Sequence, residues 1–166
     1  MSKKICITFA GVVGSSKTPI SNYLSTKLNL PVFNNDALRT EVLEDLGKFD
    51  SQEHLKRRNK RLKETVKSGI SFICDVSIDR EWPTLRDLLK QNNYRWFIIS
   101  LDLSKSFLVE LYKIKGYGES LVELDKFLLD HNIFLKNYSD EISLHITDID
   151  FNNRCETSYR KLKKLI

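Results

Sequence analysis

The sequence of 166 residues has few of the residue types that cross-link or interrupt a chain. Its cysteines are three in number and widely separated, at Cys6, Cys74 and Cys155. This pattern does not indicate a disulfide framework or a zinc site. Only six glycines and three prolines are present, and no Pro-rich or Ser-rich linker divides the chain. We therefore expect one domain over residues 1–166, long enough to fold around its own core.

Long apolar runs are also missing. A membrane-spanning helix needs about 20 apolar residues. The run at residues 5–10 is far shorter, and it leads into a glycine-containing loop rather than a cleavage site. With 41% hydrophobic and 30% charged residues, the composition predicts a globular protein that stays in the cytoplasm without membrane contact.

The charge balance narrows the class of partner only loosely. The formal net charge is +5, which favours anionic ligands such as nucleotides or nucleic acids. The three histidines, His54, His131 and His145, lie in separate segments without partner ligands at metal-binding spacing. We therefore assign them no chemistry at this stage.

Short apolar runs alternate with longer amphipathic segments along the chain, an order typical of an α/β fold with a parallel sheet between two layers of helices. Five apolar runs predict strands at residues 4–10, 31–33, 71–76, 95–102 and 143–147. The amphipathic segments predict helices at residues 17–28, 37–46, 51–68, 81–91, 105–113, 121–138 and 153–165. Residues 104–120 form the segment most like a lid, since Gly116 and Gly118 could provide a hinge or an ordinary turn.

The segment from Gly11 to Thr18 has the residues of a phosphate-binding loop. It follows the first predicted strand and opens a helix, and its order is Gly11-Val12-Val13-Gly14-Ser15-Ser16-Lys17-Thr18. Glycines allow the backbone N–H groups to approach phosphate oxygens, Lys17 can reach the β and γ phosphates of ATP, and Thr18 can ligate Mg²⁺. An ordinary strand-to-helix turn is the alternative, because the same residue types are common in turns.

One position of this loop departs from the usual pattern. The residue before the lysine is normally glycine, and here it is Ser16. A side chain at this point restricts the backbone dihedral angles, so we expect a weaker hold on the nucleotide than a glycine would give.

Two carboxylates are placed to complete such a site. Asp75 ends the apolar run Phe72-Ile73-Cys74, where a carboxylate can support the magnesium ion beside the loop. Asp36 follows the second strand with Arg39 three residues later, which puts both on one helical face. Asp36 could accept the proton of an acceptor hydroxyl, while Arg39 could hold the acceptor or the transferred phosphoryl group. The alternatives are helix capping by either aspartate and a surface ion pair of Asp36 with Arg39.

Taken together, these three segments resemble the zeta-toxin and polynucleotide-kinase-like branch of the P-loop kinases. The resemblance covers nearly the whole chain. It implies a three-layer P-loop NTPase fold with a five-stranded parallel sheet and a small helical lid. It also implies that Lys17 and Thr18 serve ATP and Mg²⁺, that Asp36 is the acceptor-side base, that Arg39 binds acceptor or phosphoryl group, and that Asp75 supports the metal.

The lid differs from the pattern of that branch. Such kinases commonly carry arginines in the lid, whereas residues 105–119 contain lysines and no arginine. Lys113 and Lys115 are the candidates to replace them, although lysine cannot make the bidentate contact of arginine.

The densest basic run lies at residues 54–67, where Leu55, Leu62 and Val66 predict an inward stripe. Arg58 and Asn59 should point near this stripe. We expect Arg58 to meet a phosphate or carboxylate of the acceptor, unless it only covers apolar surface. Trp82 could stack on a ring substrate, but a core position is commoner for tryptophan.

These features predict an ATP-dependent phosphotransferase that acts on a hydroxyl of a small molecule or nucleoside. Kinase action on a polynucleotide 5′ end is an alternative, because the lysines of residues 56–67 could follow a nucleic-acid backbone. A nucleotide-binding module without transfer is a further alternative, supported by Ser16 and the lid without arginine.

Overall fold

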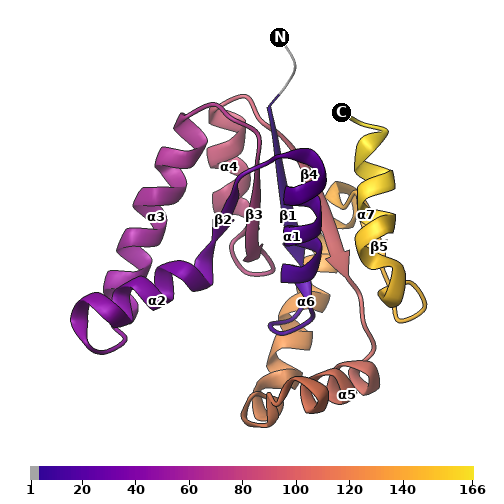
Figure 1. The fold of residues 1–166 in the computed structure, drawn as a ribbon. Coiled ribbons are helices and arrows are strands. Elements are labelled where there is room, and N and C mark those ends of the chain that lie inside the picture. Colours follow the sequence, from indigo (N-terminus) through magenta and orange to yellow (C-terminus); the bar gives the residue numbers. More distant parts are fainter. Residues whose placement is uncertain (1–3) are drawn as a thin grey trace.

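The computed structural model describes residues 4–166. A parallel five-stranded sheet forms its centre, with the strand order β2-β3-β1-β4-β5 (Figure 1). The strands are β1 (Ile5–Ala10), β2 (Val32–Asn34), β3 (Phe72–Ser77), β4 (Arg95–Leu101) and β5 (Leu144–Ile146). The predicted α/β class and five-stranded parallel sheet are therefore confirmed.

The first strand occupies the middle of the sheet, and all six of its residues are buried. It pairs with β4 from Ile5 to Ala10 and with β3 on its other side. The register with β3 shifts after Thr8, so that Phe9 lies opposite Ser77. Because the strands are parallel, their carboxyl ends meet at one edge of the sheet, where α/β folds bind ligands.

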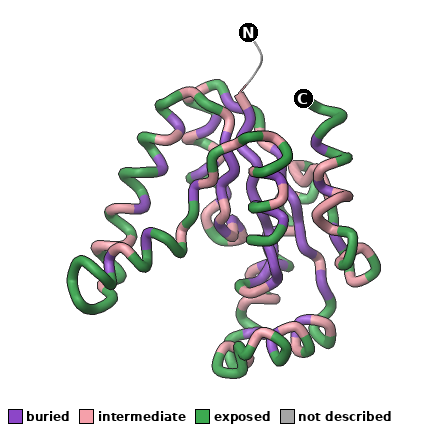
Figure 2. The backbone as a smooth tube through the Cα atoms, in the orientation of Figure 1, coloured by how far each residue is buried: buried purple, intermediate pink, exposed green. Residues whose placement is uncertain are grey.

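Helices cover both faces of the sheet, as predicted. They are α1 (Lys17–Leu28), α2 (Asn35–Leu46), α3 (Ser51–Lys67), α4 (Trp82–Gln91), α5 (Lys105–Lys115), α6 (Leu124–Tyr138) and α7 (Arg154–Lys163), with short 3₁₀ helices η1 (Gly118–Glu123), η2 (Ser139–Glu141) and η3 (Phe151–Asn153). One buried cluster joins the sheet to α1, α5 and α7, and the other joins it to α3, α4 and α6. Figure 2 shows the buried strands between these more exposed helices.

Several predicted helix limits were wrong. The second helix begins at Asn35 rather than residue 37, and the fifth continues to Lys115. The predicted helix over residues 121–138 is divided into η1 and α6, and the last helix is preceded by η3. Apolar spacing does not distinguish these short 3₁₀ turns from the α-helices that follow them.

Local capping explains where two of the helices begin. The Asn34 side chain accepts hydrogen bonds from the backbone N–H groups of Asp36 and Ala37, at 2.9 and 3.2 Å. Asp50 accepts from Gln52 and Glu53, both at 2.9 Å. Each contact satisfies N–H groups that a helix start leaves without partners. Asn34 thus caps α2, and the carboxylate of Asp36 is not used for that purpose.

The inward side of α3 differs from the predicted one. Its buried residues are Arg58, Leu62 and Val66, whereas Leu55 is 52% exposed and Asn59 is exposed. Trp82 is fully buried, and its ring lies edge-on to that of Trp96. Trp82 is therefore a core residue.

In residues 4–166, none of the helices has the length and apolar character that a membrane crossing requires.

Candidate active site

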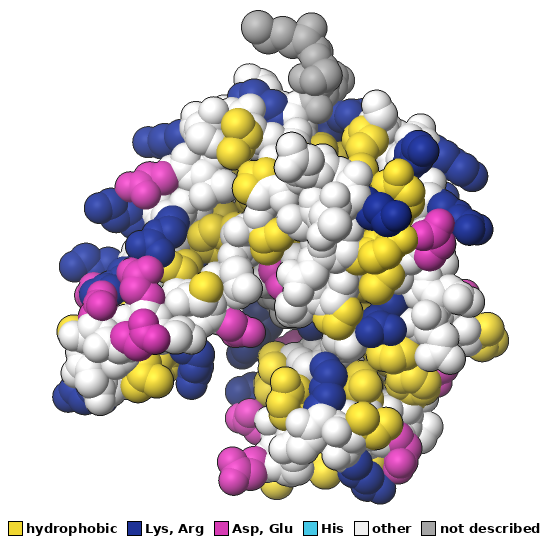
Figure 3. All heavy atoms as spheres, viewed as in Figure 1, with side chains coloured by type: hydrophobic (Ala, Val, Ile, Leu, Met, Phe, Trp, Pro, Cys, Tyr) yellow, Lys and Arg dark blue, Asp and Glu magenta, His cyan; other side chains and the backbone are white. Residues whose placement is uncertain are grey.

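A cavity with a volume of about 700 Å³ lies at the carboxyl edge of the sheet. Its wall is formed by the loop after β1, the start of α2, the end of β3 and the turn after α5. Figure 3 shows a hollow between the α2–α3 hairpin and the segment containing α5, with charged side chains at its rim. The predicted site residues that line this cavity are Gly14, Ser16, Lys17, Thr18, Asp36, Asp75 and Lys115.

The loop after β1 is held at its first glycine. Gly11 has φ 132°, its N–H donates to Asp79 Oδ1 at 3.0 Å, and its carbonyl accepts from Ser77 Oγ at 2.7 Å. Gly14 has φ 77°, and a Cβ atom there would lie 3.0 Å from the ring of Tyr112. Only glycine combines this backbone conformation with so close an approach.

Ser16 takes the left-handed conformation that a glycine would normally provide. Its φ and ψ are 75° and 44°, and its hydroxyl accepts a hydrogen bond from Arg154 Nη2 at 3.3 Å. A left-handed backbone costs a residue with a side chain about 1–2 kcal/mol. The structure thus keeps the glycine-like turn despite Ser16, and one contact from α7 partly offsets its cost.

Lys17 is buried beneath the loop. Its ammonium donates to the carbonyl of Val12 and to Ser15 Oγ, the latter at 2.9 Å. Burial lowers the pKa of Lys17 to about 8, although Asp79 and Asp75 act to raise it. The N-terminus of α1 has no side-chain cap, so its N–H groups and this ammonium form a place where phosphate oxygens would be favourable.

Asp75 and Thr18 meet the requirements of a magnesium site. Burial raises the pKa of Asp75, while the Thr18 hydroxyl and the Lys17 ammonium act to lower it. A partly buried carboxylate of this kind gains from a nearby cation. Mg²⁺ usually takes one or two protein oxygens and completes its shell with phosphate and water. The donor set therefore fits Mg²⁺ bound together with a nucleotide.

Asp36 and Arg39 are not brought together as the sequence predicted. Asp36 lies in the first turn of α2, lines the cavity and is exposed. Arg39 is absent from the cavity wall, and its guanidinium carbon lies 4.0 Å from the centre of the Phe49 ring. This cation–π contact turns Arg39 toward the tip of the hairpin. Its predicted role at the acceptor is thus not supported by the geometry.

Two further predicted contacts differ from the structure. Arg58 is buried, but it faces Glu81, with Arg58 Nη2 at 2.8 and 2.7 Å from the two carboxylate oxygens. A buried guanidinium needs a partner, and here the protein supplies it. Lys113 pairs with Glu110 on the surface of α5, 2.9 Å away, and does not line the cavity.

The segment after β4 closes against the phosphate-binding loop. The Tyr112 hydroxyl donates to the carbonyl of Val13, and Lys115 Nζ donates to the carbonyl of Gly14 at 2.9 Å. The ring of Tyr117 lies beside Tyr112 and also lines the cavity. Burial lowers the pKa of Lys115, and the charge of Arg154 adds to this effect. Of the two lid lysines predicted from the sequence, Lys115 reaches the loop.

A histidine that the sequence left without a role lies behind the loop. His131 of α6 is buried, with Nδ1 3.2 Å from Asp79 Oδ1 and Nε2 2.8 Å from Asp102 Oδ1. Burial acts to lower the pKa of His131, but hydrogen bonds with the two carboxylates raise it to about 9. His131 is therefore a cation at neutral pH that joins Asp102, just before α5, to the carboxylate that holds Gly11.

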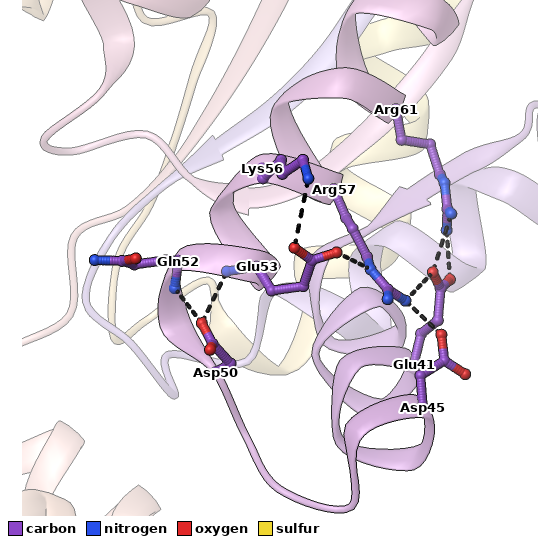
Figure 4. A network of polar contacts seen from close by, with 8 residues as sticks. All are labelled: Glu41, Asp45, Asp50, Gln52, Glu53, Lys56, Arg57 and Arg61. Carbon is purple, nitrogen blue, oxygen red and sulfur yellow. Dashed lines mark hydrogen bonds and ion pairs between the residues drawn. The ribbon is translucent and has the colours of Figure 1, made fainter.

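The α2–α3 hairpin is joined by a surface network of charges (Figure 4). Arg57 contacts Glu41 at 3.0 Å, Asp45 at 2.5 Å and Glu53 at 2.8 Å, and Arg61 contacts Glu41 at 2.6 Å. Networks of this kind fix geometry better than isolated surface pairs. The network holds α2, and with it Asp36, against α3.

Arg154 is a second residue near the loop that was not predicted from the sequence. It lies at the start of α7, where its guanidinium packs over the Phe151 ring and contacts Ser16. Its position just after β5, at the carboxyl edge of the sheet, is the signal that could have identified it.

Comparison with known proteins supports the fold. No family model matches the sequence, and no curated protein matches it. A solved chain of the PezAT chromosomal toxin–antitoxin system of Streptococcus pneumoniae aligns with a TM-score of 0.67 at 14% identity, over 88% of this chain and 68% of that one. The APS kinase CysC of Mycobacterium tuberculosis, solved with AMPPNP and APS, aligns with a TM-score of 0.60 at 17% identity, over 97% and 98%.

Shikimate kinase from Bacteroides thetaiotaomicron aligns with a TM-score of 0.58 at 15% identity, over 97% of both chains. The identities are low, so these matches establish the fold and leave the chemistry to the residues of this chain. The chain therefore has the fold of the P-loop kinases.

Proposed function

We propose that the protein is an ATP-dependent phosphotransferase whose acceptor is a hydroxyl of a small molecule or nucleoside. The observation that carries the proposal is one cavity lined by Lys17, Thr18, Asp75 and Asp36. The first three are the residues expected around ATP and Mg²⁺, and Asp36 faces them from another element. Phosphoryl transfer relies mainly on such positioning and on charge stabilisation.

In the proposed reaction, the acceptor oxygen forms a bond to the γ-phosphorus of ATP. The bond between that phosphorus and the β–γ bridging oxygen breaks, and ADP leaves. The carboxylate of Asp36 accepts the hydroxyl proton, for which its exposure in the cavity and its freedom from capping are suited. Lys17 and Lys115 offset charge on the phosphates, and Mg²⁺, when bound by Thr18 and Asp75, would neutralise charge on the β and γ groups.

We place the protein near the zeta-toxin and polynucleotide-kinase-like branch, on the basis of the loop, the Asp36 segment and Asp75. We also propose that residues 1–166 act as one domain and that residues 104–120 form a lid. The contacts of Tyr112 and Lys115 with the loop support this assignment of the lid.

The test is an assay with γ-labelled ATP against pooled nucleosides, sugars, acids, amino alcohols and oligonucleotides. We expect label in a small hydroxyl compound, with loss of transfer in Lys17→Ala and in Asp36→Asn. Transfer that survives both substitutions would refute the site. Binding of AMPPNP without transfer to any pool would favour the nucleotide-binding module instead.

Kinase action on a polynucleotide 5′ end is retained as a second candidate because Lys56, Lys60 and Lys63 are all exposed on α3. It requires that short oligonucleotides bind and that their affinity falls steeply with salt. Label appearing on the 5′ end of an oligonucleotide, with no label on small compounds, would favour this candidate.

A further inference from the structure

A smaller cavity adjoins the candidate active site. Its volume is about 340 Å³, within the range of small-molecule sites. It lies between the phosphate-binding loop, the turn after β3 and helix α6. The two cavities share four lining residues, which are Val13, Ser77, Arg80 and Glu81. The turn after β3 therefore borders both the space beside Asp36 and a second space.

Two of the carboxylates that line the smaller cavity have close cationic partners. His131 Nδ1 lies 3.2 Å from Asp79 Oδ1. Arg58 Nη2 lies 2.8 and 2.7 Å from the two carboxylate oxygens of Glu81. Neither Asp79 nor Glu81 therefore adds an unmatched negative charge to this space.

The third pair, which Arg80 forms with Asp130 of α6, is looser. Arg80 Nε lies 3.5 Å from Asp130 Oδ2, and that oxygen is buried without a hydrogen bond. The Arg80 side chain is 64% exposed, so a ligand can reach the guanidinium but not this oxygen. Within residues 4–166, the Nη groups of Arg80 have no protein partner. Their donors therefore remain for a ligand.

The other cations on the cavity walls are already engaged. Among the described residues these are Lys17 and Lys115, and each donates to a backbone carbonyl of the phosphate-binding loop. A guanidinium presents paired donors that match the two oxygens of a carboxylate or a phosphate. Arg80 is thus the accessible cation on these walls that is best suited to hold an anionic group.

The position of Arg80 favours the acceptor over the nucleotide as the source of that anionic group. Arg80 lines the smaller cavity, whereas Lys17, Thr18 and Asp75 line only the larger one. The smaller cavity also has an apolar wall, formed by Val12, Val13 and Phe127. Such a wall suits the carbon skeleton of a small molecule. An anion held by Arg80 on this side would therefore belong to a molecule other than the nucleotide.

We propose that Arg80 is an acceptor-binding residue and that the acceptor is a small alcohol carrying a carboxylate or a phosphate group. The anionic group binds the guanidinium of Arg80, while the hydroxyl lies beside Asp36. A forked ion pair of this kind holds the acceptor in one orientation, which lowers the entropic cost of aligning its hydroxyl with the γ-phosphate. The inference rests on the proposed phosphotransferase function and specifies its substrate class.

The first experiment offers γ-labelled ATP with four acceptor pools of similar size: hydroxy carboxylic acids, phosphorylated polyols, neutral polyols and amino alcohols. We expect transfer to one of the two anionic pools at least tenfold above the neutral and amine pools, and the labelled pool identifies the anionic group. Equal labelling of all pools, or a preference for neutral or amine acceptors, would overturn the inference and leave the phosphotransferase function intact. No transfer to any pool, with AMPPNP still bound, would overturn both.

Variants of Arg80 test the residue itself. Arg80→Ala should raise KM for the selected acceptor at least tenfold, with AMPPNP affinity within about twofold of the wild type. Arg80→Lys keeps the charge but not the paired donors, so its rise in KM should be smaller. Arg160→Ala is the matched control, because the Arg160 side chain is 75% exposed, pairs with Glu156 and lines neither cavity. An unchanged KM in Arg80→Ala, or an equal rise in Arg160→Ala, would overturn the assignment.

A neutral analogue of the acceptor, with its acidic group replaced by an amide or a hydroxyl, separates anion binding from other effects of Arg80→Ala. KM for this analogue should be the same in the wild type and in Arg80→Ala within about twofold. An equal rise in KM for the charged acceptor and the analogue would overturn the contact with the anionic group. An equal fall in kcat for both, with KM unchanged, would overturn it in favour of a contact with the transferred phosphoryl group.

Discussion

Lys17 is a buried cation without a carboxylate partner at hydrogen-bonding distance among the described residues. Its ammonium is bonded to a carbonyl and a hydroxyl of its own loop, and burial lowers its pKa to about 8. A nucleotide binds the charged form better, so deprotonation of Lys17 opposes binding. Under the proposed function, nucleotide affinity should therefore depend on pH over the range in which Lys17 loses its proton.

We therefore expect AMPPNP affinity to fall by up to about tenfold per pH unit above pH 8. Lys17→Arg keeps its charge throughout this range and should show a flatter profile, whatever its affinity at neutral pH. Calorimetric titrations between pH 7 and 10 would measure both. A decline of the same steepness in Lys17→Arg would contradict the assignment of the window to Lys17.

His131 gives a second pH dependence, this time in stability. Its pKa is about 9 in the folded chain, against an ordinary value of 6.5. A raised pKa gives stability that is fully present below pH 6.5 and is lost as pH rises through 9. The difference corresponds to about 3 kcal/mol.

At each pH, the free energy of unfolding of the wild type is compared with that of His131→Gln. The advantage of the wild type should be about 3 kcal/mol larger at pH 6 than at pH 9.5. Urea denaturation at several pH values measures this difference. His145→Gln is the control, because it removes a more exposed contact to Asp102 and should show a smaller change. A gap between wild type and His131→Gln that stays constant with pH would refute the cationic state of His131.

Ser16 offers a direct test of backbone strain. Ser16→Gly removes the side chain from a left-handed position and should raise the free energy of unfolding by about 0.5–1 kcal/mol. Ser68→Gly is the contrasting control, because Ser68 has φ −61°, and it should lower the free energy of unfolding. Denaturant titration of both variants measures the two changes. Destabilisation by Ser16→Gly would show that its contact with Arg154 outweighs the strain.

The sequence predicted the position, though not the role, of those candidate residues that depend only on their own segment. Lys17, Thr18 and Asp75 each follow from a strand end or helix start, so local order is enough to place them. Arg58 and Arg39 could not be placed, because their partners, Glu81 and Phe49, depend on tertiary packing. His131 was missed for the same reason: its two carboxylates lie 52 and 29 residues away in the chain.

Among the elements, residues 104–120, the proposed lid, have a direct link to the loop after β1. Tyr112 is fully buried and donates to the carbonyl of Val13, while Asp102 and His131 join the two ends of the segment. The strands were predicted to within about one residue because buried parallel strands are continuous apolar runs. The boundary between η1 and α6 was not predicted, because apolar spacing does not distinguish a 3₁₀ turn from the α-helix that follows it.

Tyr112→Phe removes that hydroxyl and leaves the carbonyl of Val13 without its donor. Loss of this hydrogen bond should lower AMPPNP affinity about fivefold, which corresponds to about 1 kcal/mol. Amide hydrogen exchange in residues 105–123 should become faster. Tyr117→Phe is the control, because the Tyr117 hydroxyl makes no hydrogen bond within residues 4–166, and it should leave both quantities near the wild-type values. Equal effects in the two variants would refute a specific tie through Tyr112.

For the whole molecule, our proposal assigns the nucleotide to the loop after β1, which the fold positions, and the acceptor to individual residues around the cavity. Figure 1 shows the α2–α3 hairpin and the lid on opposite sides of the loop, and the cavity between them has residues from both. Under the proposed function, the acceptor would be selected by residues of the hairpin and of residues 104–120, which lie outside the sheet.

The central claim is that Asp36 serves the transfer step while the loop serves the nucleotide. Its most direct test is Asp36→Asn, measured for AMPPNP affinity and for transfer from γ-labelled ATP to the identified acceptor. We predict affinity within about twofold of the wild type and a fall in transfer of about 10²–10⁴-fold. Transfer at the wild-type rate in Asp36→Asn would contradict this account.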